Sequence, residues 1–122
     1  MAENHYITKT GIQGSVHISE EVIAAIVTES VREVEGITGF ATSLGGEIAE
    51  RLGKKASSKG VKVYVEENEV KVDLFVLVQY GTVISEIANA VQEKVASTME
   101  AMTGVVLHAV NVTVCGIAFE RK

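Results

Sequence analysis

Alternating apolar and polar residues predict four strands along this chain. The clearest stretch is "EVKVDLFVLVQY", in which every second residue from Val70 to Tyr80 is apolar. A period of two places these residues on one face of a strand. Shorter alternations predict strands in "GSVHIS" (14–19), "VKVYVE" (61–66) and "VVLHAVNVTVCGIAF" (105–119). Because only Glu67 and Asn68 separate the second pair of runs, 61–66 and 69–80 are expected to form a β-hairpin.

Two other segments repeat their apolar residues every three or four positions, which is typical of amphipathic helices. The first helix is expected over residues 20–35, with Ser19 as its N-cap and Gly36 just beyond its end. The second follows Gly81 and Thr82, has its apolar stripe between Ile84 and Met102, and ends at Gly104.

The resulting order is β-α-β-β-α-β, in a chain of 122 residues that fits one domain. We predict an α+β fold, a two-layer sandwich in which two helices cover one face of a four-stranded sheet. Ferredoxin-like winding is one solution, and the strand order stays open. Residues 1–10 are expected to be a flexible tail, with an edge strand as the alternative. Residues 11–122 then form the single domain, with a long loop at 37–60.

The face of the sheet away from the helices carries apolar residues that need a cover. Phe75 and Leu77 lie on the odd-numbered face of the 69–80 strand. Strand parity adds three more unless a bulge at Gly116 resets it, and the predicted interface is Tyr64, Phe75, Leu77, Ile117 and Phe119. Either the apolar residues of the 37–60 loop or another protein chain is available as a cover, and we expect them to share this face.

Composition excludes several function classes. A net charge of −5 and a pI near 5.2 argue against binding to nucleic acid or to anionic lipid. The longest apolar runs, such as "LFVLV", are far shorter than the ~20 residues that span a bilayer. A single cysteine, Cys115, excludes an internal disulfide and fits a reducing cytosol. No signal peptide is recognisable at the N-terminus. We expect a cytoplasmic protein.

No residue pattern points to catalysis or to a cofactor. Cys115 and a histidine (His5, His17 or His108) form a conceivable nucleophile pair, but a mid-strand cysteine is usually a small buried hydrophobic residue. The histidines are scattered over separate elements and lack the spacing of a metal site. We therefore expect no catalytic residue, no metal and no cofactor.

The 37–60 segment raises two binding hypotheses. Its glycines suggest a phosphate-binding loop, but Gly53-Lys54 is followed by Lys55 where that motif needs Ser or Thr. A basic loop remains, which either is simply solvated or docks onto an acidic partner or a phosphate; its residues are Arg51, Lys54, Lys55 and Lys59. The "GITG" of Gly36–Gly39 matches the Gly-x-x-Gly clamp of RNA-binding KH domains in letters only, because it follows a helix cap and has no basic neighbour.

Four short motifs occur together in a specific combination. They are Val34-Glu35-Gly36 after the first helix, Tyr80-Gly81 before the second, Met102-Thr103-Gly104 after it, and Val110-Asn111-Val112 in the last strand. With the segments around them, over residues 11–120, the chain resembles the alkaline shock protein family, the envelope stress-response proteins of Gram-positive bacteria.

This resemblance implies a small, cytoplasmic protein that is not an enzyme. Some members of the family cluster beneath the membrane through a separate membrane-embedded anchor protein. Others are linked to fatty-acid metabolism, including acetyl-CoA carboxylase, and "AERLGKKASSKGVKV" (49–63) is similar to a loop of that branch. No catalytic residue of the family is available to carry over.

Two functions follow as hypotheses. The first is a scaffold for envelope stress response or homeostasis, which associates with itself and docks onto partners. The second is a regulator of fatty-acid synthesis that binds acetyl-CoA carboxylase or a related lipid enzyme. The expected partners are further copies of the chain and a membrane-anchor protein or carboxylase subunits. Membrane association would then be indirect.

Overall fold

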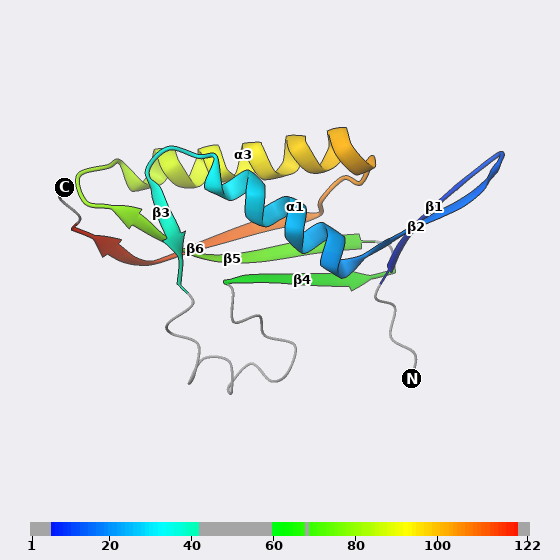
Figure 1. The fold of residues 1–122 in the computed structure, drawn as a ribbon, viewed down its shortest axis with the longest axis horizontal. Helices are drawn as coiled ribbons and strands as arrows, with labels where there is room; N and C mark the ends of the chain where they lie inside the picture. The colour runs from blue at the N-terminus through cyan, green and yellow to red at the C-terminus, as the bar shows by residue number, and fades with distance from the viewer. Residues whose placement is uncertain (1–5, 42–59, 68, 120–122) are drawn as a thin grey trace, which may run out of the picture.

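The computed structural model describes residues 6–41, 60–67 and 69–119, which form two helices and six strands (Figure 1). In chain order the elements are β1 (Tyr6–Gly11), β2 (Gly14–Ser19), α1 (Glu20–Arg32), β3 (Ile37–Phe40), β4 (Val61–Glu66), β5 (Glu69–Gln79), α3 (Ile84–Thr103) and β6 (Ala109–Ala118).

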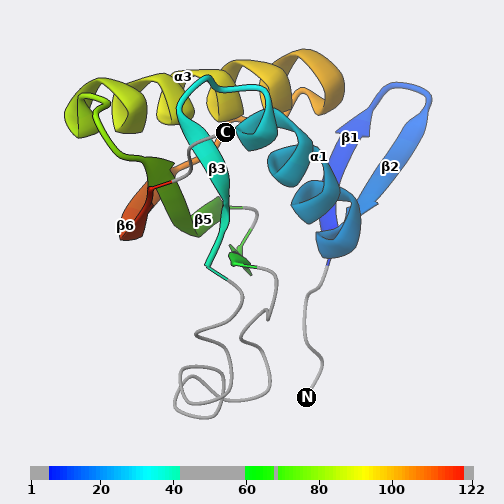
Figure 2. The same ribbon diagram turned by 60° about the vertical axis from the view of Figure 1, so that its left-hand side comes forward.

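Strand β5 is the centre of a four-stranded sheet. Strands β3 and β4 both run antiparallel to it along one side, and β6 runs parallel to it along the other. The parallel pair is joined through α3, which makes a β-α-β crossover. Both helices lie on the same side of this sheet (Figures 1 and 2).

The core fills the space between the sheet and the helices. Every even-numbered residue of β5 from Val70 to Val78 is completely buried. These side chains pack with the apolar stripes of the two helices, which are Ile23, Val27 and Val31 on α1 and Ile87, Val91, Val95 and Met99 on α3. The apolar face of β5 repeats every two residues and the apolar stripes of the helices repeat every three or four. These three surfaces pack together as one core layer.

The predicted α+β class with two helices is confirmed, but the predicted β-α-β-β-α-β order of the elements is only partly matched. Gly14–Ser19 was expected to be the first strand of the main sheet, and it pairs instead with β1 in a separate two-stranded sheet. The fourth place in the main sheet is taken by β3, which lies where a loop was expected. Ferredoxin-like winding is therefore wrong.

The expected tail over residues 1–10 is also wrong for residues 6–10. They belong to β1, which pairs with β2 from Tyr6↔Ser19 to Gly11↔Gly14. Figures 1 and 2 show this hairpin projecting from the body of the protein beyond α1. Ile7 anchors its base with an exposed fraction of 2%, whereas Ile12 at its tip is fully exposed. The edge strand that was the alternative is thus the observed structure, and residues 1–5 lie outside the described part.

Strands β3 and β4 together make one interrupted edge strand. Along β5 the register runs from Ile37↔Val78 to Phe40↔Val76 and continues from Val61↔Leu74 to Glu66↔Glu69. At the interruption, the Ala41 N–H donates to the Phe75 carbonyl at 2.9 Å, and the Phe75 N–H donates to the Gly60 carbonyl at 2.9 Å. Ala41 and Gly60 thus share the place of a single residue opposite Phe75, and residues 42–59 are inserted between them.

The ends of the helices agree with their sequence signals. Ser19 Oγ accepts a hydrogen bond from the Val22 N–H at 3.2 Å, which confirms the N-cap of α1. That helix ends at Arg32, three residues before the predicted end at 35, and Gly36 turns the chain into β3 with φ of +100°. Gly104 closes α3 in the left-handed conformation, as predicted.

Candidate interaction surface

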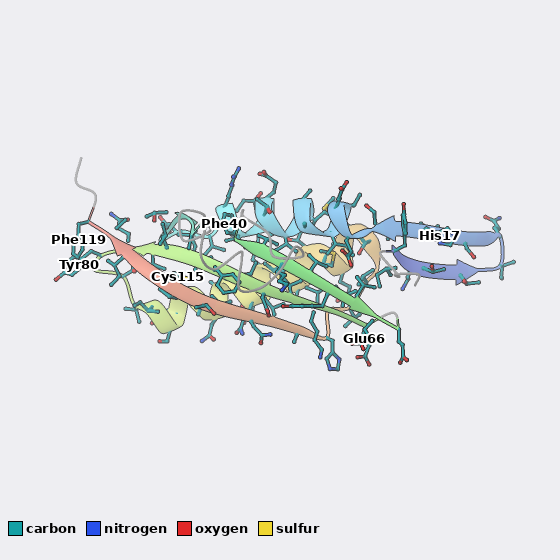
Figure 3. The ribbon with its side chains drawn as sticks, turned by 90° about the horizontal axis from the view of Figure 1, so that it is seen from below. His17, Phe40, Glu66, Tyr80, Cys115 and Phe119 are labelled. Carbon is teal, nitrogen blue, oxygen red and sulfur yellow. The ribbon has the colours of Figure 1, made fainter. Side chains whose placement is uncertain are left out.

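The sheet has one face without helices, and we call this the open face. Figure 3 views the sheet from this side. Lys71, Asp73, Phe75 and Leu77 of β5 alternate with the buried core residues, so their side chains point to the open face. The register adds Tyr64 from β4, which is opposite Lys71, and Thr113 from β6, which is opposite Phe75.

Three of the five predicted interface residues are brought together on this face. Tyr64 is 39% exposed, and Phe75 and Leu77 are half-buried in the isolated chain. The expectation that Phe75 and Leu77 lie opposite the core is therefore met by the geometry. What covers them stays a prediction, because Leu44, Ile48 and Leu52 of the predicted apolar cover lie outside the described residues. Phe40, the described member of that cover, does not lie on the open face: it pairs with Val76 and packs against the core.

Ile117 and Phe119 do not join this face, which corrects their predicted position. A bulge shifts the register of β6, so that Val76 pairs with Val114 but Leu77 pairs with Gly116. Cys115 is the extra residue, and the parity of the strand reverses after it. Ile117 therefore pairs with Val78 and shares the helix side of the sheet. The sequence raised this possibility at Gly116, but it did not decide it.

Ile117 and Phe119 instead belong to a second apolar cluster at the end of the sheet. The rings of Phe119 and Tyr80 are 5.0 Å apart between centroids, and Figure 3 shows the two side chains together at this end. Phe119 and Tyr80 are each 65% exposed, and Ile117 is 43% exposed. Sequence parity placed Tyr80 on the core face, but it lies beyond the last residue of β5.

Polar contacts frame the apolar residues of the open face. Asn111 Nδ2 donates to Asp73 Oδ1 at 2.9 Å, and this bond links β6 to β5. The Lys62 ammonium lies 4.9 Å from the centroid of the Tyr64 ring, within the range of a cation–π contact. The face thus combines aromatic and aliphatic groups with a polar border, a composition typical of protein interfaces.

The predicted basic docking loop cannot be placed on this surface. Arg51, Lys54, Lys55 and Lys59 all lie outside the described residues. Their segment leaves and re-enters the sheet at Ala41 and Gly60, next to Phe75. The "GITG" segment is described, and Ile37–Phe40 forms β3. Because a strand occupies it, the helix-flanked clamp of a KH domain does not form there.

Cys115 lies at the bulge and shows no sign of activation. Burial raises the pKa of its thiol above the ordinary value, and its Sγ is 3.9 Å from the Thr113 carbonyl oxygen. A raised pKa leaves the thiol neutral near pH 7, whereas the thiolate is the nucleophile. No group of three His, Cys, Asp or Glu side chains suited to a metal ion occurs in the part of the chain that the structure describes.

We expect Cys115 to react slowly with alkylating agents in the folded protein. At pH 8, iodoacetamide should modify Cys115 more slowly than it modifies the same thiol in urea-unfolded chain. The reason is that folding reduces both the thiolate fraction and the access to it. Mass spectrometry of timed samples measures both rates. Equal rates in the folded and unfolded chain would contradict the description of Cys115 as a shielded structural residue.

No helix among the described residues is long and apolar enough to cross a membrane. The candidate site consists of two surfaces, which are the open face of the sheet and the apolar cluster of Tyr80, Ile117 and Phe119 at one end of that sheet.

Comparisons with known proteins agree on one family. The model of the alkaline shock protein 23 family, described as having a cell envelope-related function, matches residues 8–119. YqhY of Bacillus subtilis is 32% identical over 109 residues, which cover 89% of this chain and 81% of that protein. YloU of the same organism is 36% identical over 106 residues, covering 85% and 88%. Both carry the description "uncharacterized", and no solved structure matches. The chain therefore belongs to the alkaline shock protein 23 family, whose function is related to the cell envelope.

Proposed function

We propose that this protein is a non-enzymatic interaction protein that serves the cell envelope by self-association and by docking onto partner proteins. The observation that carries this proposal is the open face, where Tyr64 is exposed and Phe75 and Leu77 are partly exposed on a sheet that has helices on its other side only (Figures 1 and 2).

The energetics of the open face support a binding role. Each Å² of apolar surface removed from water contributes about 25 cal/mol, so covering two or three such side chains stabilises a complex by a few kcal/mol. Aromatic residues at the centre of an interface contribute most of its binding energy. Phe75 occupies such a position, because it lies on the central strand with Thr113 as its neighbour on β6.

The cell envelope-related function of the family supports an envelope role for the proposed binding. The described residues offer no helix that crosses a membrane, so we propose that the protein reaches the membrane from the cytoplasm through a membrane-embedded partner. The open face is the surface that we assign to this contact and to contacts between copies.

Phe75→Asp tests the open face directly. A buried carboxylate without a partner costs several kcal/mol, so this variant should lose the contacts, with partners or with other copies, that are made through the open face. Gln79→Asp is the matched control, because Gln79 is an exposed residue of the same strand and the same face and the charge change is identical. Sedimentation equilibrium compares the molar masses. If Phe75→Asp changed neither association, nor partner binding, nor stability, the proposal would be wrong.

A second function is favoured by one feature of the sequence. No acidic residue occurs between Glu50 and Glu66, whereas Arg51, Lys54, Lys55, Lys59 and Lys62 do. Such a basic stretch in an acidic protein suits an acidic partner surface, and acetyl-CoA carboxylase or a related lipid enzyme is the alternative partner. Under this alternative, adding the protein changes the rate of carboxylase, and Lys54→Ala with Lys55→Ala removes the effect.

A further inference from the structure

Strand β6 forms an edge of the main sheet that is capped by a side chain at one position, where pairing with another strand would have to displace or share that contact. Its ten residues pair with β5 on one side, and no other strand of the described residues pairs with them. Figure 3 shows β6 along the border of the sheet. One of its carbonyls, that of Val110, accepts a hydrogen bond from Gln92 Nε2 at 3.0 Å.

Edge strands normally carry devices that prevent pairing with another chain, such as lysine, proline or a charge along the strand. The opposite border has such charges in β4, where Lys62 and Glu66 are located. Strand β6 reads "AVNVTVCGIA" and has no charged residue and no proline. Among the described strands it is the longest without a charge, and only its bulge at Cys115 interrupts it.

A second copy of this chain is the occupant that this edge fits best. Each copy carries a net charge of −5, so contact between two copies is least costly at a surface that adds no charges of its own, and β6 has none. A strand edge is also self-complementary, because a two-fold axis perpendicular to the sheet brings the strand antiparallel to itself.

The bulge decides where the two-fold axis lies. It limits the regular part of β6 to Ala109–Val114. An axis at Val112 places Val110 opposite Val114 of the other copy on the helix side. On the open face the same axis places Asn111 of each copy opposite Thr113 of the other copy, which makes two such pairs. Both kinds of pair are favourable cross-strand neighbours.

We infer that β6 pairs antiparallel with β6 of a second copy around Val112, so that two four-stranded sheets become one continuous sheet. The open faces of the two copies then lie side by side and present Phe75 twice to a further partner. This inference specifies one contact of the self-association proposed above, and it uses the edge of the sheet rather than its face.

A cysteine cross-link tests this arrangement. Cys115→Ser removes the only cysteine, and Thr113→Cys then introduces an exposed one at the edge. In the inferred dimer, the two copies of residue 113 are separated by two residues along the strand direction and by one spacing between neighbouring strands. Their distance is therefore about 8 Å. A short bismaleimide spans this distance and should convert most of the protein to a covalent dimer.

The matched control is Lys71→Cys in the same background. Lys71 is exposed on the same face but lies on the central strand, and in the inferred dimer its two copies are about 25 Å apart. Cross-linking at residue 113 alone supports the edge pairing. Cross-linking at both sites overturns it and shows that the faces stack, which leaves the proposed function intact. No cross-linking at residue 113 also overturns it.

Hydrogen exchange provides a second readout on the unmodified chain, in case the cysteine variants fold poorly. Light scattering first identifies the protein concentrations at which the mass is that of one chain, 13.0 kDa, and those at which it is twice that mass. The amides of β6 should exchange at least tenfold more slowly at the higher concentrations than at the lower ones. Unchanged exchange in β6 across that range would overturn the inference.

Discussion

Gly60→Ala should lower the free energy of unfolding by about 2–4 kcal/mol, from the cost of a left-handed residue with a side chain plus a steric clash. Gly60 has φ of +82°, a conformation that residues with a Cβ rarely adopt. A Cβ added there would lie 2.8 Å from Phe40 Cβ and 2.9 Å from the Phe75 carbonyl oxygen. The backbone of the central strand cannot move away cheaply. Urea denaturation followed by circular dichroism measures the loss.

Gly39→Ala is the control for this prediction. Gly39 lies in β3 on the same interrupted edge, and no atom lies within 4 Å of the position of an added Cβ. Its replacement should change stability by about 0.5 kcal/mol or less. If both variants unfolded at the same urea concentration as the native chain, the junction of Ala41, Gly60 and Phe75 would not have the geometry described here.

Leu74→Ala should lower the free energy of unfolding by about 2–5 kcal/mol, as is usual for a leucine removed from a tightly packed core. Leu74 is completely buried at the middle of β5, with Val61 and Val112 as its register partners on either side. The cavity left by its side chain would be enclosed by the helices and the sheet, and it would collapse only partially. Thermal or urea unfolding detects this loss, and association should be unaffected under conditions where the variant is folded.

Phe75→Ala is the informative comparison, because it changes the next residue on the opposite face. Phe75 is half-buried, so its truncation should cost less stability than that of Leu74. It should instead weaken association. If Phe75→Ala destabilised the isolated chain as much as Leu74→Ala and left association unchanged, the open face would belong to the core and not to an interface.

The core strand and the helices were predictable because their signals are local and long. Five alternating apolar residues specify β5, and a strand must point them to one side. The start of α1 and the end of α3 were predictable for the same reason, whereas α1 ends three residues before its predicted end. The Ser19 cap and the Gly104 cap depend on the backbone of the adjacent turn and on no distant contact.

The strand order was not predictable because the missing strands have no pattern of their own. Strand β3 has four residues, two of which are Thr38 and Gly39, and it is a strand only because it pairs with β5. Strand β1 contains one buried residue, Ile7, and depends on its hairpin with β2. Long-range pairing of this kind leaves little trace in local composition.

The candidate site was predictable as far as strand parity holds. Tyr64, Phe75 and Leu77 lie in uninterrupted parts of β4 and β5, and parity placed them correctly. Ile117 and Phe119 follow the bulge at Cys115, and a one-residue insertion moves every later side chain to the other face. The glycine at position 116 was the sequence signal for this bulge. The structure gives a reason for a glycine there, because an added Cβ would lie 3.1 Å from Leu77 Cδ2.

Recovery of partners by the native chain and by Phe75→Asp shows whether the open face is the docking surface of this protein. The full chain, with Gln79→Asp as the control, is used as bait at physiological salt in an extract of the source cells, and the bound proteins are quantified by mass spectrometry. The native chain and the control are expected to recover a membrane-embedded protein, and Phe75→Asp is expected to lose most of it. Equal recovery by Phe75→Asp would contradict a docking role for the open face.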